Sequence, residues 1–377
     1  MVELAHLDWH KTPTLTSTLA ALVTWGAANH GSRDLLVIDE LRLSYAEADQ
    51  RSAAFALQLL SFGVGRGTRV GVLLPNGSEF IVTWFALARI GAVAVPVSTL
   101  SSAPELARIC RSAGFALLVT TDRQPGTNLL ERLASTLQLA EGDTAIASLE
   151  VPHLRNIWLW NGTARWANPI VERQSTLAEG NLVAAAEALV TPADTIAVIY
   201  TSGSASEPKG VIHSHGNFLR SSRRWAASMP YIDGDRLFAA SPMFWVGGLI
   251  TSLLTMMQVG GALIGSAHTG SELLDVIERE RCTALQVWPH LARRIADDPS
   301  FAGRDWSAMR VGSIGAMLTA ASTDAPPFGF AMGMTGPACT GYGSSHRRSG
   351  YRRATGRGIS RRAPSPRRYV DARIRRT

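Results

Sequence analysis

Residues 69–120 alternate between short apolar runs and segments with helical spacing. The runs RVGVLLP (69–75), AVAVPV (92–97) and FALLVT (115–120) have the length and composition of buried strands. Between them, residues 78–91 and 103–114 have the length and the glycine boundaries of helices. Apolar strands that alternate with such helices predict a mostly parallel sheet covered on both faces. The expected fold class is therefore α/β.

The rest of the chain extends this pattern. Ser44-x-x-Glu47 is a capping box that predicts a helix ending before Gly63, and Ser78 and Ser271 are expected to cap two other helices. Residues 121–190 have no clear period and are expected to be peripheral. Further strands and helices are expected over 194–316. We expect a first α/β subdomain over 1–190, a second over 191–343, and a disordered tail over 344–377.

An uncharged stretch, Trp245–Gly265, has the length of a membrane span. The other interpretation is a buried helix to about Gln258, a break at Gly260 and Gly261, and a buried strand. The internal glycines favour the second interpretation.

Basic charge is concentrated at the end of the chain. Residues 344–377 hold twelve arginines and one acid, Asp371, without helical or strand periodicity. This composition predicts disorder. Three interpretations stay open for this tail: off-frame sequence, a nucleic-acid-binding arm, or a surface for a partner. Three distant cysteines and a start that is not a signal peptide favour a reducing compartment, so a cytoplasmic protein is expected.

The stretch YTSGSASEPKG (200–210) follows a short apolar strand and is rich in glycine and hydroxyl residues. Its backbone N–H groups and hydroxyls suit an anion, and Lys209 is one of only two lysines in the chain. The stretch is neither a Walker A loop nor a nucleophile elbow. Spacing alone leaves a phosphate-binding loop and a polar turn equally open.

The same stretch resembles the signature loop of the adenylate-forming superfamily, which includes acyl-CoA synthetases, adenylation domains of peptide synthetases and luciferases. The segments SPMFWVGG, GSIGAML and MGMTG resemble, in order, the acyl-pocket, adenine and F/Y-G-x-T-E segments of that family. The resemblance covers roughly residues 15–343 and implies the large N-terminal domain of these enzymes, with sheets and helices in two subdomains.

The family activates a carboxylic acid as an acyl-adenylate, and in its acyl-CoA synthetases the CoA thiol then displaces AMP. The resemblance therefore implies ATP, Mg²⁺ and CoA as cofactors and a fatty or other apolar carboxylic acid as the substrate. It implies no specific nucleic-acid partner. Peripheral membrane contact and the oligomeric state stay open.

Site residues are carried over by position from the family's motifs. The nucleotide is expected to contact Thr201, Ser202, Gly203, Ser204, Ser206, Lys209, Gly210, Gly315, Ala316, Met334 and Thr335. Lys209 and Thr335 are the expected catalytic residues. The acyl pocket is expected to be bordered by Phe244, Trp245, Val246 and Gly247.

The chain departs from the family's pattern in four ways. Ala205 and Ser206 replace the usual Thr-Gly, and Gly336 stands where the family has its magnesium-binding glutamate. The segment between Ala320 and Met332 is short. No T-G-D motif and no late catalytic lysine follow, which predicts a chain truncated or frameshifted after about Gly343. Full activity is therefore not expected.

Two other interpretations stay open. His213 and His215 have the i, i+2 spacing of a metal pair on a strand, but no third ligand is apparent, which favours structural histidines and no metal site. The whole chain is alternatively a non-catalytic protein that binds nucleotides or polyanions, or a gene remnant without a stable fold.

Overall fold

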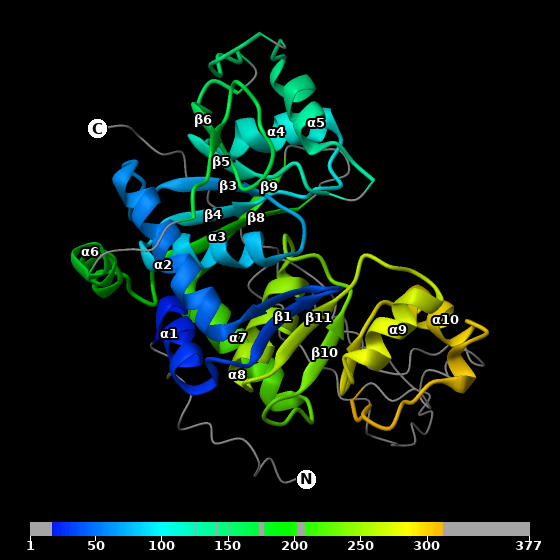
Figure 1. The fold of residues 1–377 in the computed structure, drawn as a ribbon. Helices are drawn as coiled ribbons and strands as arrows, with labels where there is room; N and C mark the ends of the chain where they lie inside the picture. Colours follow the sequence, from blue (N-terminus) through cyan, green and yellow to red (C-terminus); the bar gives the residue numbers. More distant parts are fainter. Residues whose placement is uncertain are drawn as a thin grey trace, which may run out of the picture. The chain divides into compact units, whose positions relative to one another are not determined.

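The computed structural model describes residues 17–124, 126–140, 142–149, 151–172, 177–201 and 208–311, which form two β-sheets with helices around them (Figure 1). This arrangement confirms the predicted α/β class. The predicted tail, 344–377, lies outside the described residues.

The larger sheet has seven strands in the order β7-β6-β5-β3-β4-β8-β9. All neighbouring strands are parallel except β8 and β9, which are antiparallel. The three apolar runs of the sequence form its centre, because each strand there is buried on both faces. The bounds are β3 Arg69–Leu73, β4 Val93–Pro96, β5 Leu117–Thr120, β6 Asn156–Leu159, β7 Asn168–Pro169, β8 Thr195–Thr201 and β9 Lys209–Ser214.

The smaller sheet has five strands in the order β12-β10-β11-β1-β2. Strand β1 pairs parallel with β11 and antiparallel with β2, and β10 lies parallel between β11 and β12. The bounds are β1 Asp34–Ile38, β2 Leu41–Ser44, β10 Arg236–Ala239, β11 Ala262–Gly265 and β12 Ala284–Gln286.

The two sheets exchange strands across the subdomain boundary expected at residue 190. Strands β1 and β2 come from the first part of the chain but complete the five-stranded sheet, whereas β8 and β9 come from the second part but join the seven-stranded sheet. Each sheet therefore needs both halves of the chain.

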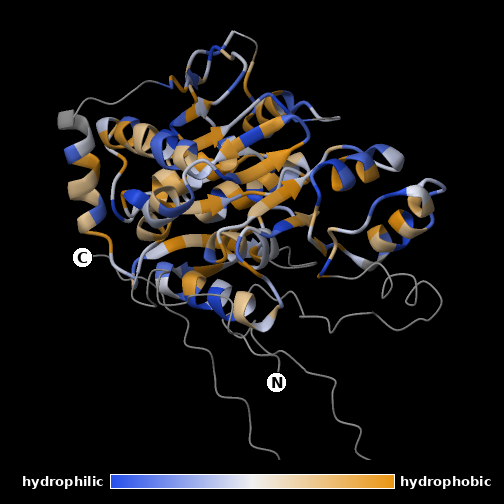
Figure 2. Ribbon diagram, turned by 60° about the horizontal axis from the view of Figure 1, so that its bottom comes forward, coloured by the Kyte–Doolittle hydropathy of each residue, from blue (hydrophilic) through white to orange (hydrophobic). Residues whose placement is uncertain are grey.

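Helices lie between the two sheets and on their outer faces. The largest core joins both sheets through apolar residues of α1, α2, α3, α7 and the π-helix, while α4 and α5 cover the other face of the larger sheet and α9 and α10 cover the smaller one. Hydrophobic residues are common in the strands that lie between these helices (Figure 2). The bounds are α1 Leu19–His30, α2 Tyr45–Ser61, α3 Ser78–Arg89, α4 Ala103–Ala113, α5 Leu129–Leu137, α6 Leu177–Ala188, α7 His215–Ser228, α8 Thr255–Gln258, α9 Ser271–Arg279, α10 Pro289–Ala296, the π-helix Gly247–Leu254 and a 3₁₀ turn Phe301–Gly303.

Capping explains where several helices begin. The capping box of Ser44 and Glu47 is confirmed at the start of α2. The caps predicted at Ser78 and Ser271 are wrong, because Gly77 and Gly270 occupy the cap positions. The Ser78 hydroxyl donates to the Glu79 carboxylate at 2.9 Å instead of accepting a backbone N–H.

The uncharged stretch 245–265 is divided among the π-helix, α8 and β11. Among the described residues, no helix combines the length and hydropathy of a membrane span. The sequence interpretation as a buried helix, a glycine break and a buried strand is therefore confirmed. Within 121–190, in contrast, the sequence analysis missed four elements: α5, β6, β7 and α6.

Candidate functional site

The predicted phosphate loop leaves the carboxyl end of β8, at the edge where the other parallel strands of the larger sheet also end. Thr201 is the last residue of β8, and Lys209 is the first residue of β9. Their Cα atoms are partners in the antiparallel register, and Lys209 is exposed. The register therefore holds Lys209 where the chain returns from the loop, although residues 202–207 lie outside the described residues.

Gly210 follows Lys209 at a crowded position. A Cβ atom there would lie 2.8 Å from Val198 Cγ1 and 3.1 Å from Cζ of the Tyr200 ring. Tyr200 is its register partner on β8. Gly210 therefore lets β9 pack closely against the Tyr200 ring. This is a structural reason for the glycine, which the sequence suggested only as a nucleotide contact.

The predicted acyl-pocket residues, Phe244–Gly247, connect β10 to the π-helix. The Phe244 side chain is buried, whereas the Trp245 side chain is 45% exposed. Their rings meet edge to face with centroids 5.0 Å apart. Val246 and Gly247 are half-buried. The segment thus exposes the Trp245 ring to solvent and anchors it on the buried Phe244. An exposed aromatic ring of this kind can line a pocket for an apolar ligand.

The π-helix after this segment is held by hydroxyl groups. Thr251 and Ser252 donate to the carbonyl of Gly247 at 2.7 and 3.2 Å, and Thr255 donates to that of Ile250 at 2.7 Å. Gly248 is required, because a Cβ there would lie 2.2 Å from the carbonyl oxygen of Pro242. π-Helical turns are frequent at functional sites. The sequence analysis missed this element.

Asn76 joins the carboxyl ends of the two sheets. It lies between β3 and α3, and its Oδ1 accepts from the backbone N–H of Met243 at 2.7 Å. Its Nδ2 donates to the carbonyl of Ser241 at 3.1 Å. Both bonds reach the loop that carries the predicted acyl-pocket residues. Asn76 is thus a positioning residue for that loop, and its amide uses both its donor and its acceptor.

The two histidines of the H-x-H motif are buried inside the fold. His215 Nδ1 accepts from the backbone N–H of Leu19 at 3.1 Å, which joins α7 to α1. Burial lowers the pKa of His215 to about 4, which favours the neutral ring. The His213 ring packs against Phe218 in a tilted arrangement, with centroids 4.9 Å apart. Among the described residues, no three metal-ligating side chains gather as a metal site.

The remaining predicted contacts are not described by the structure. The backbone of Thr201 lies in β8, but its side chain is outside the description. The other predicted positions outside the described residues are Ser202, Gly203, Ser204, Ser206, Gly315, Ala316, Met334 and Thr335, together with Gly336. Their roles stay predictions.

Comparison with known proteins extends this picture. A family model described as AMP-binding enzyme matches residues 23–343. The chain is similar to the long-chain-fatty-acid–CoA ligase FadD13 of Mycobacterium tuberculosis (strain ATCC 25618 / H37Rv), with 27% identity over 269 residues, which are 71% of this chain and 48% of the relative. The chain spans about half the length of the curated relatives it matches.

Solved structures share the fold. The anthranilate CoA ligase AuaEII in complex with anthranoyl-AMP has a TM-score of 0.63 and 19% identity, over 81% of this chain and 55% of the other. The N-terminal domain of FACL13 from Mycobacterium tuberculosis has a TM-score of 0.60 and 22% identity, over 81% and 73% of the two chains. At such identities the likeness concerns the fold, which is the expected N-terminal domain.

Proposed function

The chain belongs to the family of AMP-binding enzymes, and on that premise we propose that it carries the nucleotide- and acyl-binding part of an AMP-forming acid–thiol ligase. In the proposed reaction, a substrate carboxylate oxygen attacks the α-phosphorus of ATP and pyrophosphate leaves. The thiolate of CoA then attacks the acyl carbon of the adenylate, AMP leaves, and a thioester forms. The substrates are ATP, CoA and a small carboxylic acid.

The observation that carries the proposal is the β8–β9 register. It sets the exposed Lys209 opposite Thr201, where the loop closes. The Lys209 ammonium there would offset negative charge on the phosphates while an anionic carboxylate approaches. The proposed roles of Thr201–Ser204, Ser206, Gly210, Gly315, Ala316, Met334 and Thr335 as nucleotide contacts rest on their match to the family's motifs.

The acid is proposed to be apolar. The exposed Trp245 beside the buried Phe244 supports this. An apolar chain or ring that packs against an aromatic side chain is stabilised by the burial of apolar surface. FadD13 acts, by its name, on long-chain fatty acids, and AuaEII on anthranilate. We propose a fatty or aromatic carboxylic acid for this chain, and the cytoplasm as its location.

The test is exchange of radiolabelled pyrophosphate into ATP with a panel of fatty and aromatic acids. Adenylation would be supported by acid-dependent exchange that Lys209→Ala abolishes. Lys11→Ala, which removes the only other lysine of the chain, should preserve this exchange. Exchange that is indifferent to Lys209→Ala would refute the role of Lys209. Nucleotide binding without exchange would limit the chain to binding, and no nucleotide binding would refute the proposal as a whole.

Slow turnover is also proposed, because Gly336 stands at the position where the family's motif has its magnesium-binding glutamate. A bound Mg²⁺ ion would therefore have one carboxylate ligand fewer. A divalent ion would neutralise charge on the phosphates. Gly336→Glu should then raise Mg²⁺-dependent exchange, while Gly303→Glu should not. Equal exchange by the wild type and Gly336→Glu would contradict this idea.

The second candidate, polyanion binding without catalysis, is favoured by the twelve arginines of residues 344–377. Such binding falls steeply with salt. Removal of 344–377 should abolish an interaction that survives physiological salt. If the interaction vanishes at that salt, the candidate fails.

A further inference from the structure

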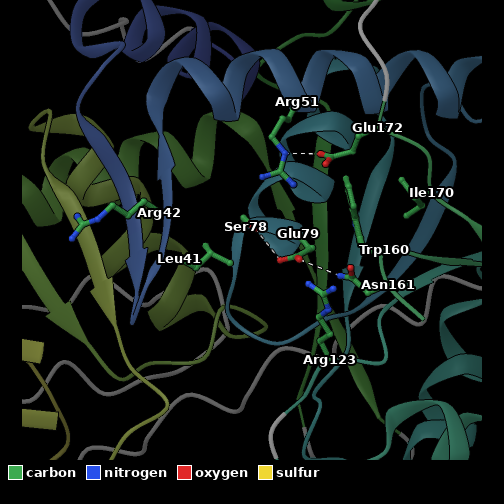
Figure 3. A pocket seen from close by; sticks show the side chains of 10 residues that line it. All are labelled: Leu41, Arg42, Arg51, Ser78, Glu79, Arg123, Trp160, Asn161, Ile170 and Glu172. Atoms are coloured by element: carbon green, nitrogen blue, oxygen red, sulfur yellow. Dashed lines mark hydrogen bonds and ion pairs between the residues drawn. The ribbon is translucent and has the colours of Figure 1, made fainter. Parts of the chain in front are cut away.

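A cavity of about 370 Å³ lies at the carboxyl edge of the larger sheet (Figure 3). Its walls come from residues that follow strands β3, β5, β6 and β7, and from β2 and α2. Its size falls in the usual range for sites of small molecules. None of the residues predicted for the nucleotide or the acid lines it.

The strand topology explains why a crevice forms there. Strand β5 lies beside β3, but the chain leaves the two strands in opposite directions: α3, which follows β3, lies in the core between the sheets, while α5, which follows β5, lies on the other face. The loops after β3 and β5 therefore diverge. Such a switch point, beyond the carboxyl ends of the strands, is where open α/β sheets bind ligands.

Two of the lining arginines are already neutralised. Arg51 Nε binds the Glu172 carboxylate at 2.5 Å. Arg42 binds Asp34 at 2.8 Å and Glu280 at 2.6 Å. These two arginines therefore have little charge to offer a ligand.

Arg123 and Glu79 differ from them. The Arg123 guanidinium has no hydrogen bond or ion pair among the described residues. The Glu79 carboxylate accepts from neutral groups, the Ser78 hydroxyl at 2.9 Å and Asn161 Nδ2 at 3.3 Å. Figure 3 shows both side chains projecting into the pocket. The cavity thus holds one uncompensated charge of each sign.

A fixed aromatic ring lies beside these charges. Trp160 Nε1 donates to the Thr83 hydroxyl at 2.7 Å, and the Arg51 guanidinium lies 5.9 Å from the centre of the ring. Leu41, 40% exposed, and the buried Ile170 add apolar surface. A ring or apolar chain entering the cavity can therefore pack on a surface whose orientation is already set.

We propose that this cavity binds a small zwitterion with an aromatic side chain, namely an aromatic α-amino acid. The planar guanidinium of Arg123 pairs with the ligand carboxylate. The Glu79 carboxylate accepts from the ligand ammonium, and the ligand ring packs against Trp160 and Ile170. A simple anion or a mononucleotide is disfavoured, because it would leave Glu79 without a cation and add like charge beside it.

The test uses three probes that share a phenyl ring and differ in charge: L-phenylalanine, 3-phenylpropionate and 2-phenylethylamine. Calorimetric titration of the full chain should show binding of L-phenylalanine. Each of the other two probes should bind about tenfold more weakly or worse, since each lacks one charge-assisted contact. Equal affinity for 3-phenylpropionate, or no binding of L-phenylalanine, would overturn the proposal.

Variants then locate the ligand. Arg123→Gln and Glu79→Gln should each weaken L-phenylalanine binding about tenfold, while the exposed controls Arg108→Gln and Glu131→Gln keep it. Retained affinity in both pocket variants, or loss of binding in Trp245→Ala instead, would place the ligand elsewhere and overturn the proposal. Because the probe series uses the wild type, a variant that fails to fold does not decide the outcome.

The site is separable from the proposed catalysis. Lys209→Ala should lose pyrophosphate exchange and keep L-phenylalanine binding. Arg123→Gln should keep pyrophosphate exchange at saturating ATP and acid, but bind L-phenylalanine more weakly. A loss of both activities in each variant would contradict a separate site.

Discussion

At the residue scale, the predicted site depends on an amide that the motifs did not single out. Asn76 holds the loop before the π-helix through one accepted and one donated hydrogen bond. Its partner Met243 is 167 positions away in the sequence. No local pattern marks such a residue, because its role arises only when two distant loops meet.

Asn76→Asp should therefore weaken this loop. The new carboxylate can still accept from Met243, but it faces the Ser241 carbonyl with an acceptor in place of a donor. We expect a loss of about 1–3 kcal/mol in the free energy of unfolding, measured by urea denaturation. If pyrophosphate exchange is present, the KM for the acid should rise. The control is Asn29→Asp, at an exposed amide that donates to one backbone carbonyl; equal losses in both variants would contradict the special role of Asn76.

Gly248 is a second decisive residue at this scale. In Gly248→Ala, the added methyl group would meet the backbone carbonyl of Pro242, which cannot swing away as a side chain could. We expect a loss of about 1–3 kcal/mol in stability, seen as a lower Tm. Gly65→Ala, where a Cβ meets nothing within 4 Å, should leave the Tm nearly unchanged. A Gly248→Ala variant as stable as Gly65→Ala would show that the π-helix can shift.

At the element scale, His215 couples the first helix to α7. Its Nδ1 accepts from Leu19 N–H, so the ring must be unprotonated at Nδ1. Its Nε2 has no partner among the described residues. The sequence analysis favoured a structural role for this histidine over a metal pair, and the ring joins two helices whose starts are 196 residues apart.

The lowered pKa of His215 predicts how stability depends on pH. The unfolded chain takes up a proton below its ordinary pKa of 6.5, whereas the folded chain resists until about 4. The contribution of the neutral ring is therefore complete above pH 6.5 and is lost as the pH falls toward 4. From pH 7 to pH 5, the free energy of unfolding should drop by about 2 kcal/mol from this group.

Urea denaturation at the two pH values checks this. In His215→Gln this part of the pH dependence should disappear, whereas the exposed control His153→Gln should keep it. An unchanged pH dependence in His215→Gln would contradict the assignment.

At the scale of the whole molecule, the strand exchange between the sheets makes the halves of the chain interdependent. Strand β1 has β11 as a neighbour, and β8 has β4. Local periodicity predicted most of these strands but not their sheets, because sheet membership depends on partners far along the chain. The break expected at residue 190 falls between β7 and β8, which both belong to the seven-stranded sheet.

Fragments 1–190 and 191–377 should therefore not fold alone. Each would expose the strand edges and apolar faces that the other half covers. Neither fragment should show a cooperative thermal transition, and mixing them during refolding should restore one. A cooperative melt of 1–190 alone would support an independent first subdomain and contradict this expectation.

The sequence by itself determined the alternation of buried strands and helices, the capping box at Ser44 and the family of the chain. It also favoured a buried helix and strand over a membrane span for the uncharged stretch 245–265. These features are local: a period, a cap or a motif is written in neighbouring residues. The tertiary structure alone decided the strand exchange, the Asn76 bridge, the helix contact of His215 and the cavity between Arg123 and Glu79. Each of these joins residues that are distant in sequence, and hydrogen bonding and charge compensation depend on distance in space.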